Sequence, residues 1–244
     1  MLRRTALAAA AAWSLFAPGL AGEATPASDQ WYAWSNRGRP CGYAHLLRKA
    51  SGDKQAPVLL ITVFEAQAPK RHVSLKMQTF CRDDAYLTPV RIVSEGEGDD
   101  ELGTFDATID WSDGKEGLLR TELRGEAVER RLPEHTVTDF ALFEIVRRLP
   151  FTPGVAFEFH AFEAAELLLK RNHKISCLGT EELTLGGRTA EFHKFEQTGD
   201  GIRAVQYWVD DEHNLVRVVM DGRKEWRLAT AAEAMAAFKN AVDD

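Results

Sequence analysis

Turn-forming residues interrupt this chain at short, regular intervals. Roughly every 8 to 15 residues, a segment rich in Gly, Pro or Asp separates two runs of Val, Ile, Leu, Phe, Tyr and Trp. Segments such as EGEGDDELG, WSDGKEG and TGDGI are of this kind. Antiparallel strands can be joined by short turns, whereas parallel strands need long crossovers, so the pattern predicts hairpins and meanders. The expected fold class is mainly β (α+β), built on a long antiparallel sheet.

The apolar runs also predict that this sheet is curved. Residues 57–64, PVLLITVF, do not alternate between apolar and polar, so both faces of that strand must be covered. More apolar surface comes from WYAW at residues 31–34 and FEFHAF at residues 157–162. An antiparallel sheet that bends around a helix, as a half-barrel, buries such surface and can leave a groove on its concave face. A fully packed interior, or a second sheet on the other face, is the alternative.

Two segments depart from the β pattern and predict helices. In the mid-chain segment 136–150, apolar residues recur at helical spacing, Thr136 is the expected cap and Pro150 ends the run. Near the C-terminus, Thr230 and Glu233 form a capping box ahead of an apolar stripe. Both helices are expected to pack on the sheet.

The segment QYWVDDEHNLVRVV, residues 206–219, raises the question of a reactive site. Its central run Asp210–His213 (DDEH) contains groups that bind metals or transfer protons. Successive residues of a strand or turn point apart, however, so these side chains would not converge on one ion. Asp also favours turns because its side chain bonds the local backbone. The run therefore predicts the polar tip of a β-hairpin.

Two parts of the chain resemble each other. Residues 78–96 align with residues 206–222 once a short gap is allowed, and each pairs an aromatic strand with an Asp-containing turn and a returning Val-rich strand. Either a duplicated β-meander or the independent use of similar residues in two hairpins would explain the likeness.

The first residues have the composition of an export signal. Two arginines precede an apolar run that ends in small residues, which predicts a signal peptide over residues 1–21 with cleavage after Ala21 or Ala24. General secretion and the twin-arginine route both remain open. The protein is expected in the bacterial periplasm or outside the cell, with residues 25–244 as a single β-rich domain.

The net charge limits the classes of binding partner that are expected, and the cysteine content limits the possible disulfides. The net charge of −7 argues against nucleic acid, because binding a phosphate backbone requires clustered Lys and Arg. The three cysteines, Cys41, Cys81 and Cys177, form no CxxC motif. In an oxidising compartment one disulfide and three free thiols are both open.

The sequence favours a non-enzymatic role. No GxSxG, HExxH, Walker loop or dinucleotide-binding glycine motif occurs in the expected context, so no cofactor is expected. Two other classes remain open. A hydrolase or metal-dependent enzyme would use His160, His193 and nearby carboxylates, whereas a structural or protein-interaction protein of the envelope would need no such site.

The surplus apolar surface predicts that the concave face binds a hydrophobic ligand, either a lipid or a lipidated segment of a lipoprotein. The side chains expected to hold this ligand are Trp31, Trp34, Leu59, Ile61 and Phe64.

Four stretches carry a resemblance to a known group of proteins. They are WYAWSNRGRPCGYAHL, LPFTPGVAFEFHAF, GTEELTLGGRTAEFHKFEQ and YWVDDEHNLVRVVMDG. Together they resemble the bacterial periplasmic domain-of-unknown-function proteins that have a curved, lipoprotein-localisation-like sheet. The resemblance implies a half-barrel with helices on its concave side and a role in envelope or lipid-related binding. It carries no catalytic residues.

Overall fold

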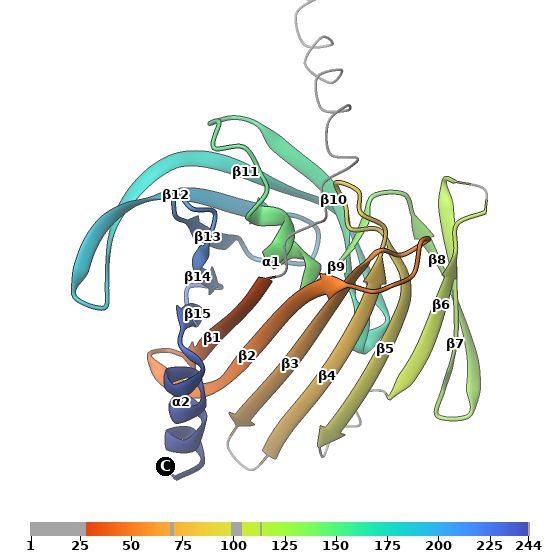
Figure 1. Cartoon of the computed structure of the whole chain (residues 1–244), viewed down its shortest axis with the longest axis horizontal. Helices are drawn as coiled ribbons and strands as arrows, with labels where there is room; N and C mark the ends of the chain where they lie inside the picture. Colours follow the sequence, from red (N-terminus) through yellow and green to blue (C-terminus); the bar gives the residue numbers. More distant parts are fainter. Residues whose placement is uncertain (1–27, 69–70, 99–103, 113, 244) are drawn as a thin grey trace, which may run out of the picture.

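The computed structural model describes residues 28–243 except 69–70, 99–103 and 113. The predicted signal peptide therefore lies outside the described residues. Fifteen strands form a single sheet (Figure 1). The first eight are β1 (Ser28–Asn36), β2 (Arg39–Ala50), β3 (Val58–Ala68), β4 (Arg71–Cys81), β5 (Pro89–Gly98), β6 (Phe105–Asp110), β7 (Glu116–Leu123) and β8 (Glu126–Pro133). The other seven are β9 (Thr136–Thr138), β10 (Ala156–Glu163), β11 (Leu168–Leu185), β12 (Arg188–Thr198), β13 (Val205–Val209), β14 (Leu215–Met220) and β15 (Lys224–Ala229).

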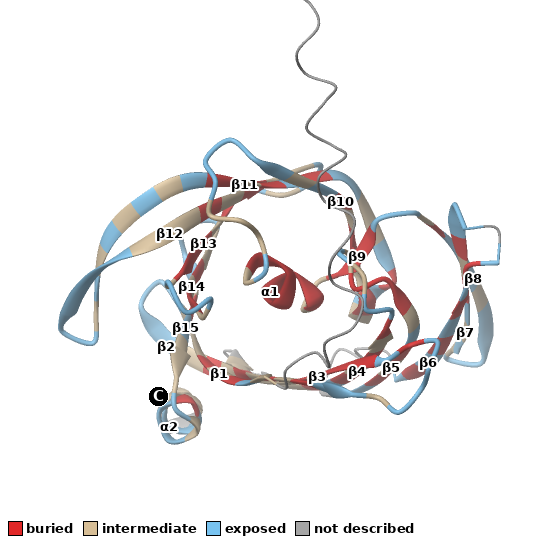
Figure 2. Cartoon of the chain, turned by 45° about the horizontal axis from the view of Figure 1, so that its top comes forward, coloured by how far each residue is buried: buried red, intermediate tan, exposed pale blue. Residues whose placement is uncertain are grey.

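The order of the strands explains why the sheet curls. The order is β8-β7-β6-β5-β4-β3-β2-β1-β15-β14-β13-β12-β11-β10-β9, so β8 and β9 lie at opposite ends of the sheet. In the chain, however, only Glu134 and His135 separate these two strands. A link of two residues spans no more than about 10 Å, so the two ends of the sheet must meet in space. Figure 2 shows the result, a nearly closed curved sheet, and the predicted curved antiparallel fold is thereby confirmed.

The mid-chain helix α1 (Ala141–Val146) lies inside the curl (Figure 2). All six of its side chains are buried. The ring of Phe143 meets Tyr32 edge-on at 5.5 Å between centroids and meets Trp226 at 6.3 Å. The helix is thus held from two neighbouring strands, β1 and β15. A helix of one or two turns is unstable alone, so this packing is what keeps it helical.

The predicted helix is confirmed, but its start was misplaced. Thr136 does not cap it, because Thr136–Thr138 form β9 and pair in parallel with His160–Phe162 of β10. The hydroxyl of Thr136 instead donates to the carbonyl of Pro133, 2.6 Å away. Competition from strand pairing therefore shortened the helix from its N-terminal side.

The C-terminal helix α2 (Ala231–Asp243) lies on the outside of the sheet. Its predicted capping box is confirmed, since the Glu233 carboxylate accepts from the Thr230 backbone N–H at 2.8 Å. The ring of Phe238 on α2 packs edge-on against Tyr43, which faces outward on β2. The expectation that both helices cover the concave side is therefore wrong for α2. This helix packs on the convex face of β1 to β3 instead.

A second apolar core forms where the ends of the sheet meet. Phe162 on β10, together with Ala164 in the short 3₁₀ helix η2 (Ala164–Glu166), packs against the inner face of the β4–β7 region. Both side chains are fully buried. The ends of the sheet are therefore closed by side-chain packing; no β8–β9 pairing occurs among the described strands.

The run Asp210–His213 forms the tip of the β13–β14 hairpin, as predicted. One carboxylate oxygen of Asp210 accepts from the backbone N–H of Asn214 at 2.7 Å, and His213 takes a left-handed conformation. The matching segment 78–96 also forms a hairpin, from β4 and β5. A duplication stays a prediction, because hairpin geometry alone would produce the same likeness.

The three cysteines are free. Cys81 and Cys177 are buried in the core around α1 and act there as small apolar side chains.

Truncating Phe143 to Ala should lower the free energy of unfolding by about 3 to 5 kcal/mol, because the cavity would open in the centre of the curl. Met235→Ala on α2 is the matched control: its side chain is 43% exposed, and we expect a change within about 0.5 kcal/mol. Urea unfolding followed by tryptophan fluorescence measures both. Equal losses would show that α1 is not the centre of the core.

Candidate functional site

The five predicted ligand residues divide between the two faces of the sheet. Trp34 lies on the concave face, because its ring packs on Trp226, which in turn contacts Phe143 of α1. Trp31 lies three residues earlier on the same strand and faces outward, where it stacks on His45 at 4.0 Å. Side chains alternate along a strand, so residues an odd number of steps apart point to opposite faces.

The same rule divides the residues of β3. Phe64 packs against Trp34 at 5.5 Å and so lies on the concave face. Leu59 and Ile61 are odd-numbered steps from Phe64 and share the convex face with Trp31. The structure therefore brings together Trp34 and Phe64, and it separates them from the other three predicted residues.

An aromatic cluster forms one end of the concave interior. Trp34, Phe64 and Trp226 pack pairwise with centroid separations of 5.5 to 5.6 Å. Trp226 is only 6% exposed, whereas Trp34 and Phe64 are half-buried. The indole N–H groups of Trp34 and Trp226 are buried and donate to no acceptor in the described part of the chain. The cluster thus offers apolar surface together with two unused hydrogen-bond donors.

Trp226 was missed by the sequence prediction. It stands in KEWRLA, where apolar residues alternate with charged ones, so a half-buried strand could have been recognised there. That Trp226 pairs with Trp34 could not have been recognised, because the pairing of β1 with β15 joins residues at opposite ends of the chain.

A shallow hollow lies next to this cluster. It measures about 240 Å³ and is bounded by the tips of the β1–β2 and β14–β15 hairpins. The lining residues are Asn36, Arg37, Asp221, Arg223 and Lys224. Asn36 is two residues beyond Trp34 on β1, or about 7 Å along the strand. Three cations against one carboxylate make this rim positive, although the chain as a whole is acidic.

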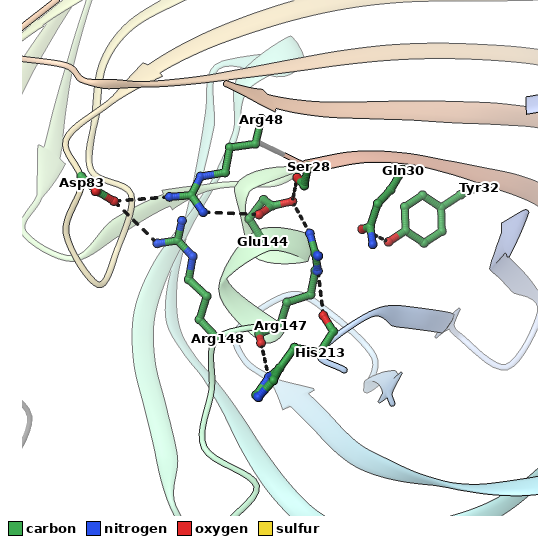
Figure 3. Close-up of polar contacts among 9 residues, drawn as sticks. All are labelled: Ser28, Gln30, Tyr32, Arg48, Asp83, Glu144, Arg147, Arg148 and His213. Atoms are coloured by element: carbon green, nitrogen blue, oxygen red, sulfur yellow. Dashed lines mark hydrogen bonds and ion pairs between the residues drawn. The ribbon is translucent and has the colours of Figure 1, made fainter. Parts of the chain in front are cut away.

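The opposite end of the interior is charged (Figure 3). The carboxylate of Glu144 on α1 is 8% exposed; it accepts from the Ser28 hydroxyl and from Arg147, each at 2.8 Å. A guanidinium nitrogen of Arg48, on β2, lies 3.9 Å from the other oxygen of Glu144. A buried carboxylate requires such partners, because an unpaired charge in the interior costs several kcal/mol.

The hairpin tip at His213 also holds the helix. Arg147 Nε donates to the carbonyl of His213 at 2.8 Å, and His213 Nδ1 donates to the carbonyl of Arg147 at 2.6 Å. These reciprocal bonds join the end of α1 to the β13–β14 turn (Figure 3). The turn predicted from Asp210–His213 therefore has a structural role that its sequence did not reveal.

His160 and His193, the candidate residues for an enzymatic function, do not lie in a common site. His160 lies on β10 opposite residues 171–172 of β11, whereas His193 pairs with Thr180 of the same strand. Eight strand residues separate these points, which is about 26 Å. His193 Nε2 donates to the carboxylate of Asp211 at 2.9 Å, and the ring stacks on Phe151. Among the described residues, no three His, Cys, Asp or Glu side chains are placed to hold a metal ion.

Comparisons with known protein families, with curated proteins and with solved structures find no match to this chain. In the part of the chain that the structure describes, no helix has the length and apolar character needed to cross a membrane.

Replacing Glu144 with Gln should lower the free energy of unfolding by about 3 kcal/mol, because it removes the carboxylate bonded to Arg147 and leaves buried cations behind. Glu129→Gln is the matched control: Glu129 pairs with Arg120 on the surface, and its loss should cost no more than about 0.5 kcal/mol. Urea unfolding at neutral pH measures both variants. Similar values for the two would contradict the structural role of the buried pair.

Asp139, between β9 and α1, predicts a pH dependence of stability. Burial raises the pKa of its carboxyl to about 7, although nearby backbone N–H groups act in the other direction. An unfolded Asp has a pKa of about 3.9, so between about pH 4 and pH 7 only the folded state keeps the proton. The stability contributed by Asp139 is therefore complete below pH 4 and is lost as the pH rises to 7. As the pH rises over that range, the free energy of unfolding of Asp139→Asn should increase relative to that of the wild type, as measured by urea unfolding. A difference between the two proteins that does not change with pH would contradict this.

Proposed function

We propose that the protein is an exported, non-enzymatic binding protein for an apolar molecule with a polar head, such as a lipid or the lipidated segment of a lipoprotein. The ligand would lie on the concave face of the curved sheet, against the aromatic cluster of Trp34, Phe64 and Trp226. The supporting observation is that Trp34 and Phe64 of this cluster are only half-buried, whereas the neighbouring Tyr32 and the side chains of α1 are buried.

The chemistry of the cluster favours such an amphiphile. Aromatic rings supply apolar contact area without much loss of side-chain freedom. The unused indole N–H groups suit an oxygen of an ester or a carboxyl group, since leaving them unpaired in a buried position is costly. The positive rim of Arg37, Arg223 and Lys224 suits a polar or anionic head at the edge of the sheet.

The export part of the proposal is supported by the sequence alone. Residues 1–21 have the composition of a signal peptide. The resemblance to periplasmic proteins with a curved sheet is consistent with a role in the envelope. An enzymatic role is less well supported, since His160 on β10 and His193 on β12 lie beside positions of β11 that are far apart.

A fluorescent long-chain fatty acid tests the binding site. Trp34→Ala should weaken its binding about tenfold or more, because losing a buried aromatic contact costs at least about 1.4 kcal/mol. Trp31→Ala is the matched control, since Trp31 lies on the same strand but on the convex face, and its affinity should equal that of the wild type. Equal weakening by both variants, or no saturable binding by the wild type, would refute the proposal.

Native mass spectrometry of protein purified from its own host supplies an independent test. We expect a bound apolar molecule on the wild type and its loss from Trp34→Ala.

A further inference from the structure

Two arginines at the charged end of the interior use few of their hydrogen-bond donors. A guanidinium group carries five N–H donors in a planar fork. Arg48 makes one hydrogen bond in the described chain, from Nη2 to Asp83 at 3.4 Å, and its buried Nε has no partner there. Among the described residues, the carboxylate oxygen closest to Arg148 is also that of Asp83, at 4.0 Å, which is too long for a hydrogen bond. Figure 3 shows both forks directed at the same carboxylate.

The guanidinium groups of three arginines gather at this end of the interior. Arg48, Arg147 and Arg148 face the two carboxylates of Glu144 and Asp83. The side chain of Arg48 is 7% exposed, and burial lowers the pKa of its guanidinium. Burial also lowers the pKa of Arg148, and the nearby charge of Arg48 acts in the same direction. Arg48 and Arg148 therefore repel each other at a partly buried position, and an additional anion beside them would offset that repulsion.

Anchoring of helix α1 does not account for this pair. Arg147 by itself makes hydrogen bonds both to Glu144 and to the His213 carbonyl. Glu144 also accepts a hydrogen bond from Ser28. These contacts join the helix to β1 and to the β13–β14 turn. Arg48 and Arg148 add only the long contacts to Glu144 and Asp83. Such contacts offset little of the desolvation cost of two partly or fully buried guanidinium groups.

We propose that Arg48 and Arg148 together bind an oxyanion, a carboxylate or phosphate group, beside Asp83. Planar guanidinium forks match such groups because two parallel N–H bonds reach two oxygens. The anion can approach from solvent, since the side chains of Arg148 and Asp83 are 29% and 32% exposed. This site lies at the opposite end of the interior from the aromatic cluster, and it does not depend on the function proposed for that cluster.

Inorganic phosphate is the probe, measured by isothermal titration calorimetry at constant ionic strength. The wild-type full chain should bind it saturably, and Arg148→Gln should weaken the binding about tenfold or more, because hydrogen bonds between charged groups are lost. Arg188→Gln is the matched control: it removes the same charge from an exposed hairpin position and should bind like the wild type. Arg148→Lys keeps the charge without the fork, and we expect it to bind less tightly than the wild type even if Arg148→Gln folds poorly.

A second arm identifies the source of the oxyanion. Vesicles of phosphatidylcholine with and without phosphatidic acid are sedimented with the same variants. Phosphate binding that is lost in the Arg148 variants indicates a free anion, and sedimentation that requires both phosphatidic acid and Arg148 indicates a lipid headgroup. Either result supports the site. No binding in both arms, or binding of equal strength in wild type and both Arg148 variants, would overturn it.

Discussion

The packing of helix α1 inside the curled sheet is the interaction on which the rest of this structure depends. Six residues, Ala141–Val146, fill the space that the concave face would otherwise leave empty, and protein interiors tolerate few such voids. The dependence is mutual. A helix this short is unstable in water, so the sheet stabilises the helix while the helix fills the sheet.

The same helix makes the two ends of the interior chemically different. Phe143 faces the aromatic residues Tyr32 and Trp226, whereas the adjacent Glu144 bonds Ser28 and Arg147. Successive residues on a helix point in directions about 100° apart, so one short segment can serve both surroundings. As a result, apolar contact gathers at one end of the curl and buried charge at the other.

Much of the fold could be predicted from local signals in the sequence. The β13–β14 turn follows from the preference of Asp210 for bonding its own backbone, and helix α2 follows from the pairing of Thr230 with Glu233. The candidate site was predicted only in part, because Trp34 and Phe64 reached the concave face while Trp31 did not. Apolar composition cannot assign a face to a strand that is covered on both sides.

The sequence by itself determined most strands, the turns between them and the cap of helix α2, since each depends on residues that are neighbours in the chain. Only the tertiary structure decided that Trp34 meets Trp226, that Arg48 meets Asp83 and Glu144, and that Thr136 joins a strand instead of capping a helix. Each of these depends on the register of strands or on closure of the sheet, which brings together residues tens of positions apart. The physical reason is that hydrogen-bonded pairing and packing select among partners, and a local pattern contains no information on which partner will be near.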